Sequence, residues 1–176
     1  MGNNFPKAYL SQEAIITTLI TKVRKEMKIE EQVLSIEQMK DLQELGVDTS
    51  DASMYWVRAK RITGEQKNNC IDRDMGKWKL SLSKSMVLPA AWKLESVPTY
   101  TIGDIVEKLP KNIDSWNDNR LVIEGDENTD YWYVVYKNRY EDAEIEYFDS
   151  ENLLTALYNL LCWVAINRKE LLGIKK

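Results

Sequence analysis

Histidine is absent from this chain of 176 residues, which contains only seven glycines, four prolines and two cysteines. Without histidine, nucleophilic catalysis with a histidine base is excluded. The glycines stand apart from one another, so the chain has no phosphate-binding loop of the Walker or dinucleotide type. The scarcity of glycine and proline also argues against low-complexity linkers. These absences remove the commonest catalytic and nucleotide-binding motifs.

The two cysteines, Cys70 and Cys162, do not make a disulfide framework. Cys162 lies in an apolar run, where a buried thiol behaves as a small hydrophobic group, and a reducing compartment is therefore expected. The N-terminus has no apolar signal core, and the longest apolar run, residues 160–166, is too short to span a bilayer. We expect a soluble cytoplasmic protein with no membrane partner.

Apolar residues make up 44% of the chain and charged residues 30%, so a real core can form. The formal net charge is −4, but it is unevenly distributed. Residues 124–151 contain ten acidic residues against Lys137 and Arg139, a formal charge of −8, which leaves +4 for the rest of the chain. Charge segregated in this way can steer a partner, although a solvated surface is the commoner explanation.

The first part of the chain predicts two amphipathic helices. The first lies within residues 1–33, and we expect it to be peripheral or to mediate self-association. The second begins at Ser35, which has capping-box spacing with Gln38, and ends at Gly46. The Asp-Thr-Ser-Asp-Ala-Ser sequence at residues 48–53 then predicts a polar turn, because these side chains bond to their own backbone.

Two segments that resemble strands follow, at residues 54–61 and 77–84, and the second alternates apolar with polar residues. Between them, residues 62–76 are polar and long for a hairpin, and we expect them to be mobile. Within residues 85–98, Pro89 excludes a regular central strand through that point. We expect a short edge strand there, followed by an irregular crossing segment.

The second half of the chain predicts a short helix, three strands and a long helix. Thr101 caps the short helix and Pro110 ends it. The strands are predicted at residues 120–125, 131–137 and 143–149. Ser150 is expected to cap the long helix, whose core stripe consists of Leu153, Leu157, Leu160, Leu161 and Val164.

This order of elements predicts an α+β domain over residues 34–176. We expect an antiparallel sheet of about five strands, with helices mainly on one face and the long C-terminal helix central to the core. Two helices, at residues 39–45 and 102–109, share an apolar-x-Asp-apolar-x-Glu pattern, which is either the trace of an αββ duplication or a chance match. The duplicated units would be residues 34–96 and 97–150, closed by the helix at 150–172.

Three phrases, at residues 34–57, 97–113 and 151–167, carry a family resemblance. A Gln-Met helix leads into Asp-Thr-Ser-x-Ala-Ser-Met, a short helix ends in Leu-Pro-Lys, and a last helix contains Leu-Cys-Trp. Together they resemble small proteins of no assigned activity that are encoded by phages and mobile elements of gut bacteria. The resemblance implies an accessory protein that acts inside a bacterial cell. It carries over no catalytic residue and no cofactor.

The leading functional hypothesis is a non-enzymatic protein that binds another protein. Alternate residues of the strand at 131–137 form two faces, one packed on the last helix and the other either covered by a second layer or exposed as a tyrosine-rich contact surface. On the next strand, Glu144 and Glu146 are expected to share a face opposite Ile145 and Tyr147. The residues predicted to bind a protein are Tyr131, Tyr133, Glu144 and Glu146.

A nucleic-acid-binding module is the alternative, and it would use the strand pair 54–61 and 77–84. If these strands pair, their cations can share one face beside an aromatic ring, a surface that suits single-stranded nucleic acid. The residues concerned are Trp56, Arg58, Lys60, Lys77 and Lys79. Trp78 alternates with the lysines and is expected to point to the opposite face, which weakens this hypothesis.

An enzyme that uses a divalent metal in the acidic segment 124–151 is the third candidate. The carboxylates there are dense, but their spacing is not that of an EF-hand loop. Such carboxylates can also take the place of nucleic-acid phosphates on a partner. We expect no cofactor, assign no catalytic or metal-binding residue, and regard a protein partner, nucleic acid and a second copy of the chain as the candidate partners.

Overall fold

A computed structural model describes residues 29–61, 76–85, 87–88, 90, 92–113, 119–126, 128–138 and 144–174. The chain divides into two compact units, Met1–Glu31 and Gln32–Lys176, compared with the predicted division into 1–33 and 34–176. The helix predicted in the first unit and all but Gly76 of the loop predicted at 62–76 lie outside the described residues. Every sheet and α-helix described belongs to the second unit.

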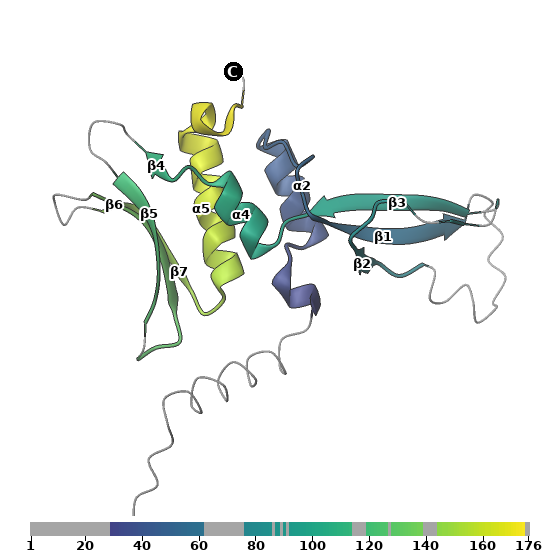
Figure 1. Cartoon of the computed structure of the whole chain (residues 1–176), viewed down its shortest axis with the longest axis horizontal. Coiled ribbons are helices and arrows are strands. Elements are labelled where there is room, and N and C mark those ends of the chain that lie inside the picture. The colour runs from purple at the N-terminus through teal and green to yellow at the C-terminus, as the bar shows by residue number, and fades with distance from the viewer. Residues whose placement is uncertain are drawn as a thin grey trace, which may run out of the picture. The chain divides into compact units, whose positions relative to one another are not determined.

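The described residues form three α-helices, two short 3-10 helices (η) and seven strands (Figure 1). In chain order these are η1 (Ile29–Gln32), α2 (Ile36–Glu44), β1 (Met54–Arg61), β2 (Lys79–Ser81), β3 (Trp92–Thr99), α4 (Ile102–Lys108), β4 (Asn112–Ile113), β5 (Asn119–Gly125), β6 (Trp132–Asn138), β7 (Glu144–Ser150), α5 (Leu153–Asn167) and η2 (Lys169–Leu172).

Helix α2 begins and ends at the residues that the sequence predicts. The Gln38 N–H donates to Ser35 Oγ (3.2 Å) and the Ser35 N–H donates to Gln38 Oε1 (2.9 Å), which completes the capping box. After the helix, Gly46 has a φ of +86°, and the Val47 N–H donates to the Leu42 carbonyl (2.9 Å). This is a Schellman ending, so local sequence defines both ends of α2.

Strand β1 lies between β2 and β3 in a three-stranded antiparallel sheet. The predicted strand at 54–61 is confirmed, whereas 77–84 contributes only the three residues of β2. The expected order within residues 85–98 is wrong, because the strand comes last and pairs with β1 along its whole length. The proline in β3 is Pro98, which an edge strand can contain without interrupting the sheet, and Pro89 lies outside the described residues.

Strands β4 to β7 form a second antiparallel sheet, in chain order. The predicted hairpin of β5 and β6 and the predicted strand β7 are confirmed. Ser150, predicted to cap the last helix, instead belongs to β7, which runs one residue further than expected. The cap is Asn152, whose side-chain oxygen accepts a hydrogen bond from the Leu154 N–H (2.8 Å).

The core joins α2, α4 and α5 to one face of the four-stranded sheet. Helix α5 contacts β6, β7 and α4, as Figure 1 shows in yellow beside the green strands. The predicted core stripe of α5 is confirmed except for Leu153, which is only half-buried. The buried residues of α5 are Leu154, Ala156, Leu157, Leu160, Leu161, Val164 and Ala165.

The α+β class is confirmed, but the strands divide between two sheets instead of forming one sheet of about five strands. Each sheet follows its own helix, the three-stranded sheet after α2 and the four-stranded sheet after α4. Strands close in sequence pair readily, so pairing is completed within each segment and nothing requires the two segments to merge. The strand orders, β2-β1-β3 and β4-β5-β6-β7, also differ between the two segments that the duplication hypothesis compares.

Candidate functional site

The four-stranded sheet has one face in the core and one outside it. The core face packs with the helices and carries Leu121, Ile123, Val134, Tyr136, Ile145 and Phe148. Tyr136 is fully buried, and its hydroxyl donates to the Pro110 carbonyl (2.7 Å). Burial raises the pKa of Tyr136 well above its ordinary value, so the hydroxyl stays a donor. The core face therefore has a structural role.

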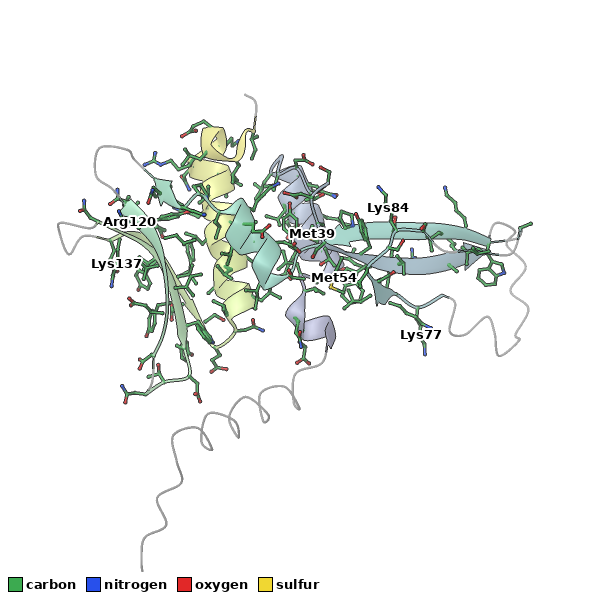
Figure 2. All side chains as sticks on the ribbon, in the orientation of Figure 1. Met39, Met54, Lys77, Lys84, Arg120 and Lys137 are labelled. Atoms are coloured by element: carbon green, nitrogen blue, oxygen red, sulfur yellow. The ribbon has the colours of Figure 1, made fainter. Side chains whose placement is uncertain are left out.

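The other face, here called the outer face, consists of three rows of cross-strand neighbours from β5, β6 and β7. The row nearest the β5–β6 turn, here called the acidic row, is Glu124, Tyr133 and Asp149. The middle row is Val122, Val135 and Tyr147. The mixed row, farthest from the turn, is Arg120, Lys137 and Glu144. Figure 2 labels Arg120 and Lys137 close together at one end of the sheet. The apolar residues of these rows do not belong to the core formed with the described helices.

The middle row gives the outer face an apolar centre. Tyr147 is 55% exposed, although it lies on the middle of a paired strand. Its cross-strand neighbour Val135 is only 3% exposed, and Val122 is half-buried. Tyr133, in the acidic row, is also half-buried and lies diagonal to Tyr147, within reach of an aromatic side chain. Tyr147, Tyr133 and Val122 thus form the accessible part of this centre, whereas Val135 is buried.

Charged groups surround this apolar centre. The Lys137 Nζ lies 3.5 Å from Glu144 Oε1 and 3.9 Å from Glu124 Oε2. Because Glu124 belongs to the acidic row and Lys137 to the mixed row, the lysine side chain must cross the middle row, and its stem can cover apolar surface there. These partly exposed ion pairs contribute little to stability, so they can be rearranged by a partner.

The turn end of the outer face is acidic. Its described carboxylates are Glu124, Asp126, Asp130, Asp149 and Glu151. The carboxylate of Asp126 accepts hydrogen bonds from the Asn128 N–H (2.8 Å) and the Thr129 hydroxyl (2.8 Å), which lower the pKa of Asp126. Asp126 therefore stays ionised to a lower pH than an ordinary aspartate. Within segments 124–130 and 149–151, the residues that the structure describes include no lysine or arginine.

The structure corrects the predicted placement of the acidic residues on β7. A register shift between Val135 and Lys137 places two residues of β7, Ile145 and Glu146, where one is expected. As a result Glu144 lies opposite Lys137 and shares the outer face with Tyr147, whereas Ile145 packs against the core. The expectation that Glu144 and Glu146 share a face opposite Ile145 and Tyr147 is therefore wrong.

Of the residues predicted to bind a protein, Tyr133 and Glu144 lie on the outer face. Tyr131 precedes β6 and lies outside the three rows, with its carbonyl accepting a hydrogen bond from the Asp126 N–H (2.8 Å). Glu146 lies in the bulge and is half-buried. The residue that sequence reasoning missed is Tyr147, because the bulge that turns it outward results from pairing with β6 and leaves no local signal.

The register of the three-stranded sheet separates the cations predicted to bind nucleic acid. Trp56 lies opposite Leu80 and Val57 opposite Lys79, so Lys79 shares the face of Val57 and not that of Arg58. Trp78 is not on the opposite face as predicted, since the guanidinium of Arg58 lies 4.4 Å from its ring centre. Figure 2 labels Lys77 beside β2, one residue before Trp78.

Glu95 on β3 pairs with the two predicted cations that remain on this face, Arg58 and Lys60. The Arg58 Nε lies 2.7 Å from Glu95 Oε2, and the Lys60 Nζ lies 3.3 Å from Glu95 Oε1. The hydrogen bond from Arg58 lowers the pKa of Glu95, which therefore stays ionised. Sequence reasoning missed Glu95 because the segment that contains it was not predicted to pair with β1. Its carboxylate reduces the basic character of the predicted surface.

A separate polar cluster, formed by Asp48, Asp51, Tyr100 and Lys108, holds the predicted turn at 48–53 against α4. The Tyr100 hydroxyl donates to the Asp48 carbonyl (2.8 Å) and to Asp51 Oδ1 (2.6 Å). The Lys108 Nζ donates to the same carbonyl (2.6 Å) and to Asp51 Oδ2 (2.7 Å). The Asp48 carboxylate accepts from the Ser50 N–H (2.9 Å), as expected for this type of turn.

The electrostatics of this cluster indicate a structural role and not a catalytic pair. Partial burial raises the pKa of Asp51, but hydrogen bonds from Lys108 and Tyr100 outweigh it and hold the pKa below its ordinary value of 3.8. Burial and the bond to Asp51 raise the pKa of Tyr100. Asp51 is therefore held ionised and Tyr100 protonated, so neither is poised to accept or release a proton near neutral pH.

A cavity of about 310 Å³ adjoins this cluster. It is lined by Asp51, Asp104, Glu107, Lys108, Leu171 and Leu172. Two of these carboxylates are already bonded, Asp51 to Lys108 and Asp104 to the Ser53 hydroxyl (2.7 Å). The lining groups therefore stabilise the fold and do not converge on a ligand.

The described residues offer no arrangement for metal or nucleophilic catalysis. Among them, no three carboxylates or thiols lie close enough to hold a metal ion, including those of segment 124–151 that the structure describes. Ser81 and Lys84 have Ser-x-x-Lys spacing, but they lie in a strand end and the residues after it, where the Ser81 hydroxyl is bonded to Ser83. In the described part of the chain, no helix is long and apolar enough to cross a membrane.

Comparison with known proteins does not identify a relative. Neither a family model, nor a curated protein, nor a solved structure matches the chain. The outer face has to be interpreted from its own geometry and charge, and the resemblance drawn from the sequence stays a prediction.

Proposed function

We propose that this protein binds another protein through the outer face of the four-stranded sheet and does not catalyse a reaction. The observation that carries the proposal is Tyr147, which is half-exposed at the centre of a face that lies outside the core. A tyrosine placed on a rigid strand offers a large contact area at low entropic cost. In the same row, the half-buried Val122 adds apolar surface.

The charged rim indicates the chemistry of the partner. The acidic row and the turn beside it carry carboxylates, and Lys137 is already paired with Glu124 and Glu144. A partner with exposed lysine or arginine side chains and an apolar patch complements this arrangement. Charge complementarity of this kind raises the rate of association and selects the partner, while contact with Tyr147 provides affinity.

The cellular context of the proposal comes from the family resemblance. The phrases shared with proteins of phages and mobile elements support an accessory role inside a bacterial cell. Nothing in the described residues competes with this proposal as a catalytic site. We therefore propose an accessory protein of the bacterial cytoplasm that acts by occupying a surface of its partner.

Capture from a lysate of the native host tests the proposal with matched baits. Wild type, Tyr147→Ala and Ile166→Ala are tagged and compared with and without nuclease. Ile166 is a fitting control because it is a large apolar residue on α5 with 56% exposure. We expect a nuclease-resistant protein to bind wild type and Ile166→Ala, and Tyr147→Ala to bind it at least about tenfold more weakly. Equal capture by all three baits would refute the proposal.

A further inference from the structure

The end of the β1–β3 ladder that is remote from Tyr100 carries an unusual pair of lysines. Lys60 lies directly opposite Lys93, and the next row on the same face pairs Arg58 with Glu95. We call Arg58, Lys60 and Lys93 the basic group. Among the described residues, Glu95 is within ion-pair distance of Arg58 and Lys60 and not of Lys93. Two like charges directly opposite each other on paired strands are unfavourable, so an anionic partner would stabilise them.

The basic group suits a protein partner better than a nucleic acid. The two tryptophans on this face already have protein partners, since the Arg58 guanidinium lies over the Trp78 ring and the Trp56 indole N–H donates to the Leu34 carbonyl (2.9 Å). Nucleic-acid-binding domains are usually strongly basic, whereas this chain has a net charge of −4. One carboxylate, Glu95, also lies within the group. A localised set of carboxylates on a protein fits such a surface better than a long phosphate backbone.

The acidic row on the outer face has the geometry that a lysine or arginine requires. Glu124 and Asp149 flank Tyr133 on the two neighbouring strands. Their Cα atoms are therefore about 10 Å apart, twice the spacing of neighbouring strands, and the tyrosine ring lies between their side chains. An ammonium or guanidinium group can meet the ring face there and remain close to both carboxylates. The Lys60 side chain is 65% exposed and Lys93 is exposed, so both can reach such a site.

We propose that the basic group of one copy of the chain docks on the acidic row of a second copy. The inference rests on the proposed function, and it identifies the protein that binds the outer face as a second copy of this chain. The two surfaces are different, so the contact is heterologous. In a pair of copies, one copy retains a free acidic row and the other retains a free basic group. Such a contact closes into a ring or continues as a chain of copies.

Sedimentation velocity on the full chain, with paired charge reversals, tests the inference. One variant combines Lys60→Glu with Lys93→Glu, and the other combines Glu124→Lys with Asp149→Lys. We expect wild type to associate with increasing concentration at about 50 mM salt and to dissociate at about 500 mM. Each variant alone should be monomeric, because both of its surfaces carry the same sign. An equal mixture of the two should associate again, because opposite signs are restored.

Three results with wild type and the charge-reversal variants would overturn the inference. These are a monomeric wild type at about 200 μM in low salt, self-association of either variant as strong as that of wild type, and failure of the mixture to associate. If a double variant does not fold, as judged by circular dichroism, the single substitutions Lys93→Glu and Glu124→Lys replace it in the same mixing experiment. A monomeric wild type that binds a single-stranded oligonucleotide through Lys60 and Lys93 would also overturn it.

Two tyrosine variants, Tyr133→Ala and Tyr147→Ala, separate this inference from the proposed function when both are compared with wild type by sedimentation and by capture. If wild type is monomeric but captures a foreign protein that Tyr147→Ala does not, the proposed function stands and the second copy is not the partner. If copies associate equally well in wild type and in Tyr133→Ala, the acidic row is not the docking site, and the inference fails. If neither Tyr133→Ala nor Tyr147→Ala changes any association, both proposals fail.

Discussion

At the scale of single residues, Tyr100 makes the most consequential contact outside the outer face. It is fully buried, and its hydroxyl bonds to both the backbone and the side chain of the 48–53 turn. We expect Tyr100→Phe to lower the free energy of unfolding by about 1–2 kcal/mol, because the Asp48 carbonyl and Asp51 each lose a donor. Urea denaturation measures this change. Tyr147→Phe is the control and should stay within about 0.5 kcal/mol of wild type. Equal effects of the two substitutions would contradict this role.

The ionised form of Asp51 makes the stability of the protein depend on pH. Its pKa in the folded chain lies below the ordinary value of 3.8, so the unfolded chain binds the proton more readily. The contribution of Asp51 is therefore complete above about pH 5 and is lost as the pH falls through the pKa of the folded state. We expect wild type to be more stable than Asp51→Asn at neutral pH, with the difference closing in acid.

Urea denaturation from neutral pH to about pH 3 measures this difference. In a Lys108→Met background the advantage of aspartate over asparagine at neutral pH should shrink, because Lys108 donates a 2.7 Å hydrogen bond to Asp51. A difference between wild type and Asp51→Asn that stays constant over the whole pH range would show that the ionised carboxylate is not what matters.

Residues whose partners are close in sequence were predictable, and those with distant partners were not. The caps at Ser35 and Thr101 involve partners three residues away and could be predicted from their spacing alone. The bond between Tyr100 and Asp51 joins residues 49 positions apart. No spacing rule predicts such a contact. The sequence therefore indicated the turn at 48–53 but not the side chains that hydrogen-bond to it.

At the scale of elements, the end of α2 provides a test with an internal control. Gly46 has a φ of +86°, and an added Cβ would lie 3.1 Å from the Ile174 side chain. We expect Gly46→Ala to destabilise the protein by about 1 kcal/mol or more. Gly103, in α4, has no positive φ, and an added Cβ would lie 3.6 Å from its nearest neighbour, Thr101 Oγ1. Gly103→Ala should therefore be neutral or stabilising by up to about 1 kcal/mol. Thermal denaturation compares the two, and equal losses would contradict the Schellman ending.

Helix α5 is expected to provide much of the core energy. Leu160 is fully buried in the core, whereas Ile166 on the same helix is 56% exposed. Leu160→Ala should lower the free energy of unfolding by about 2–5 kcal/mol, because it leaves a cavity. Ile166→Ala should cost much less. Urea denaturation of both variants measures the contrast, and similar losses would show that α5 does not pack as described.

The existence of most elements followed from the sequence, but the pairing between them did not. Alternation and capping located α2, α4, α5 and the strands β1, β5, β6 and β7. The bulge on β7 and the register of β1 with β2 depend on which strands meet, and both changed the face on which a predicted site residue lies. Because a one-residue change of register moves every side chain to the other face, errors in pairing become errors in the site.

At the scale of the whole molecule, two sheets give the described chain two distinct charged surfaces. The segregation of acidic residues into 124–151 was visible in the sequence, and the structure places part of it around the apolar centre of the outer face. The basic group on the three-stranded sheet was not predictable, because Lys93 and Glu95 lie in a segment that was not expected to pair with β1. The partition into separate sheets therefore determines which charges lie together.

The most direct test of the central claim is photo-crosslinking from the outer face in living cells. A photo-reactive benzoyl-phenylalanine is introduced in place of Tyr147 in one sample and in place of Ile166 in the other, two residues of nearly equal exposure at 55% and 56%. The account predicts a discrete crosslinked protein, a second copy or another partner, from position 147 and none from position 166. No crosslink from position 147, or the same product from both positions, would contradict it.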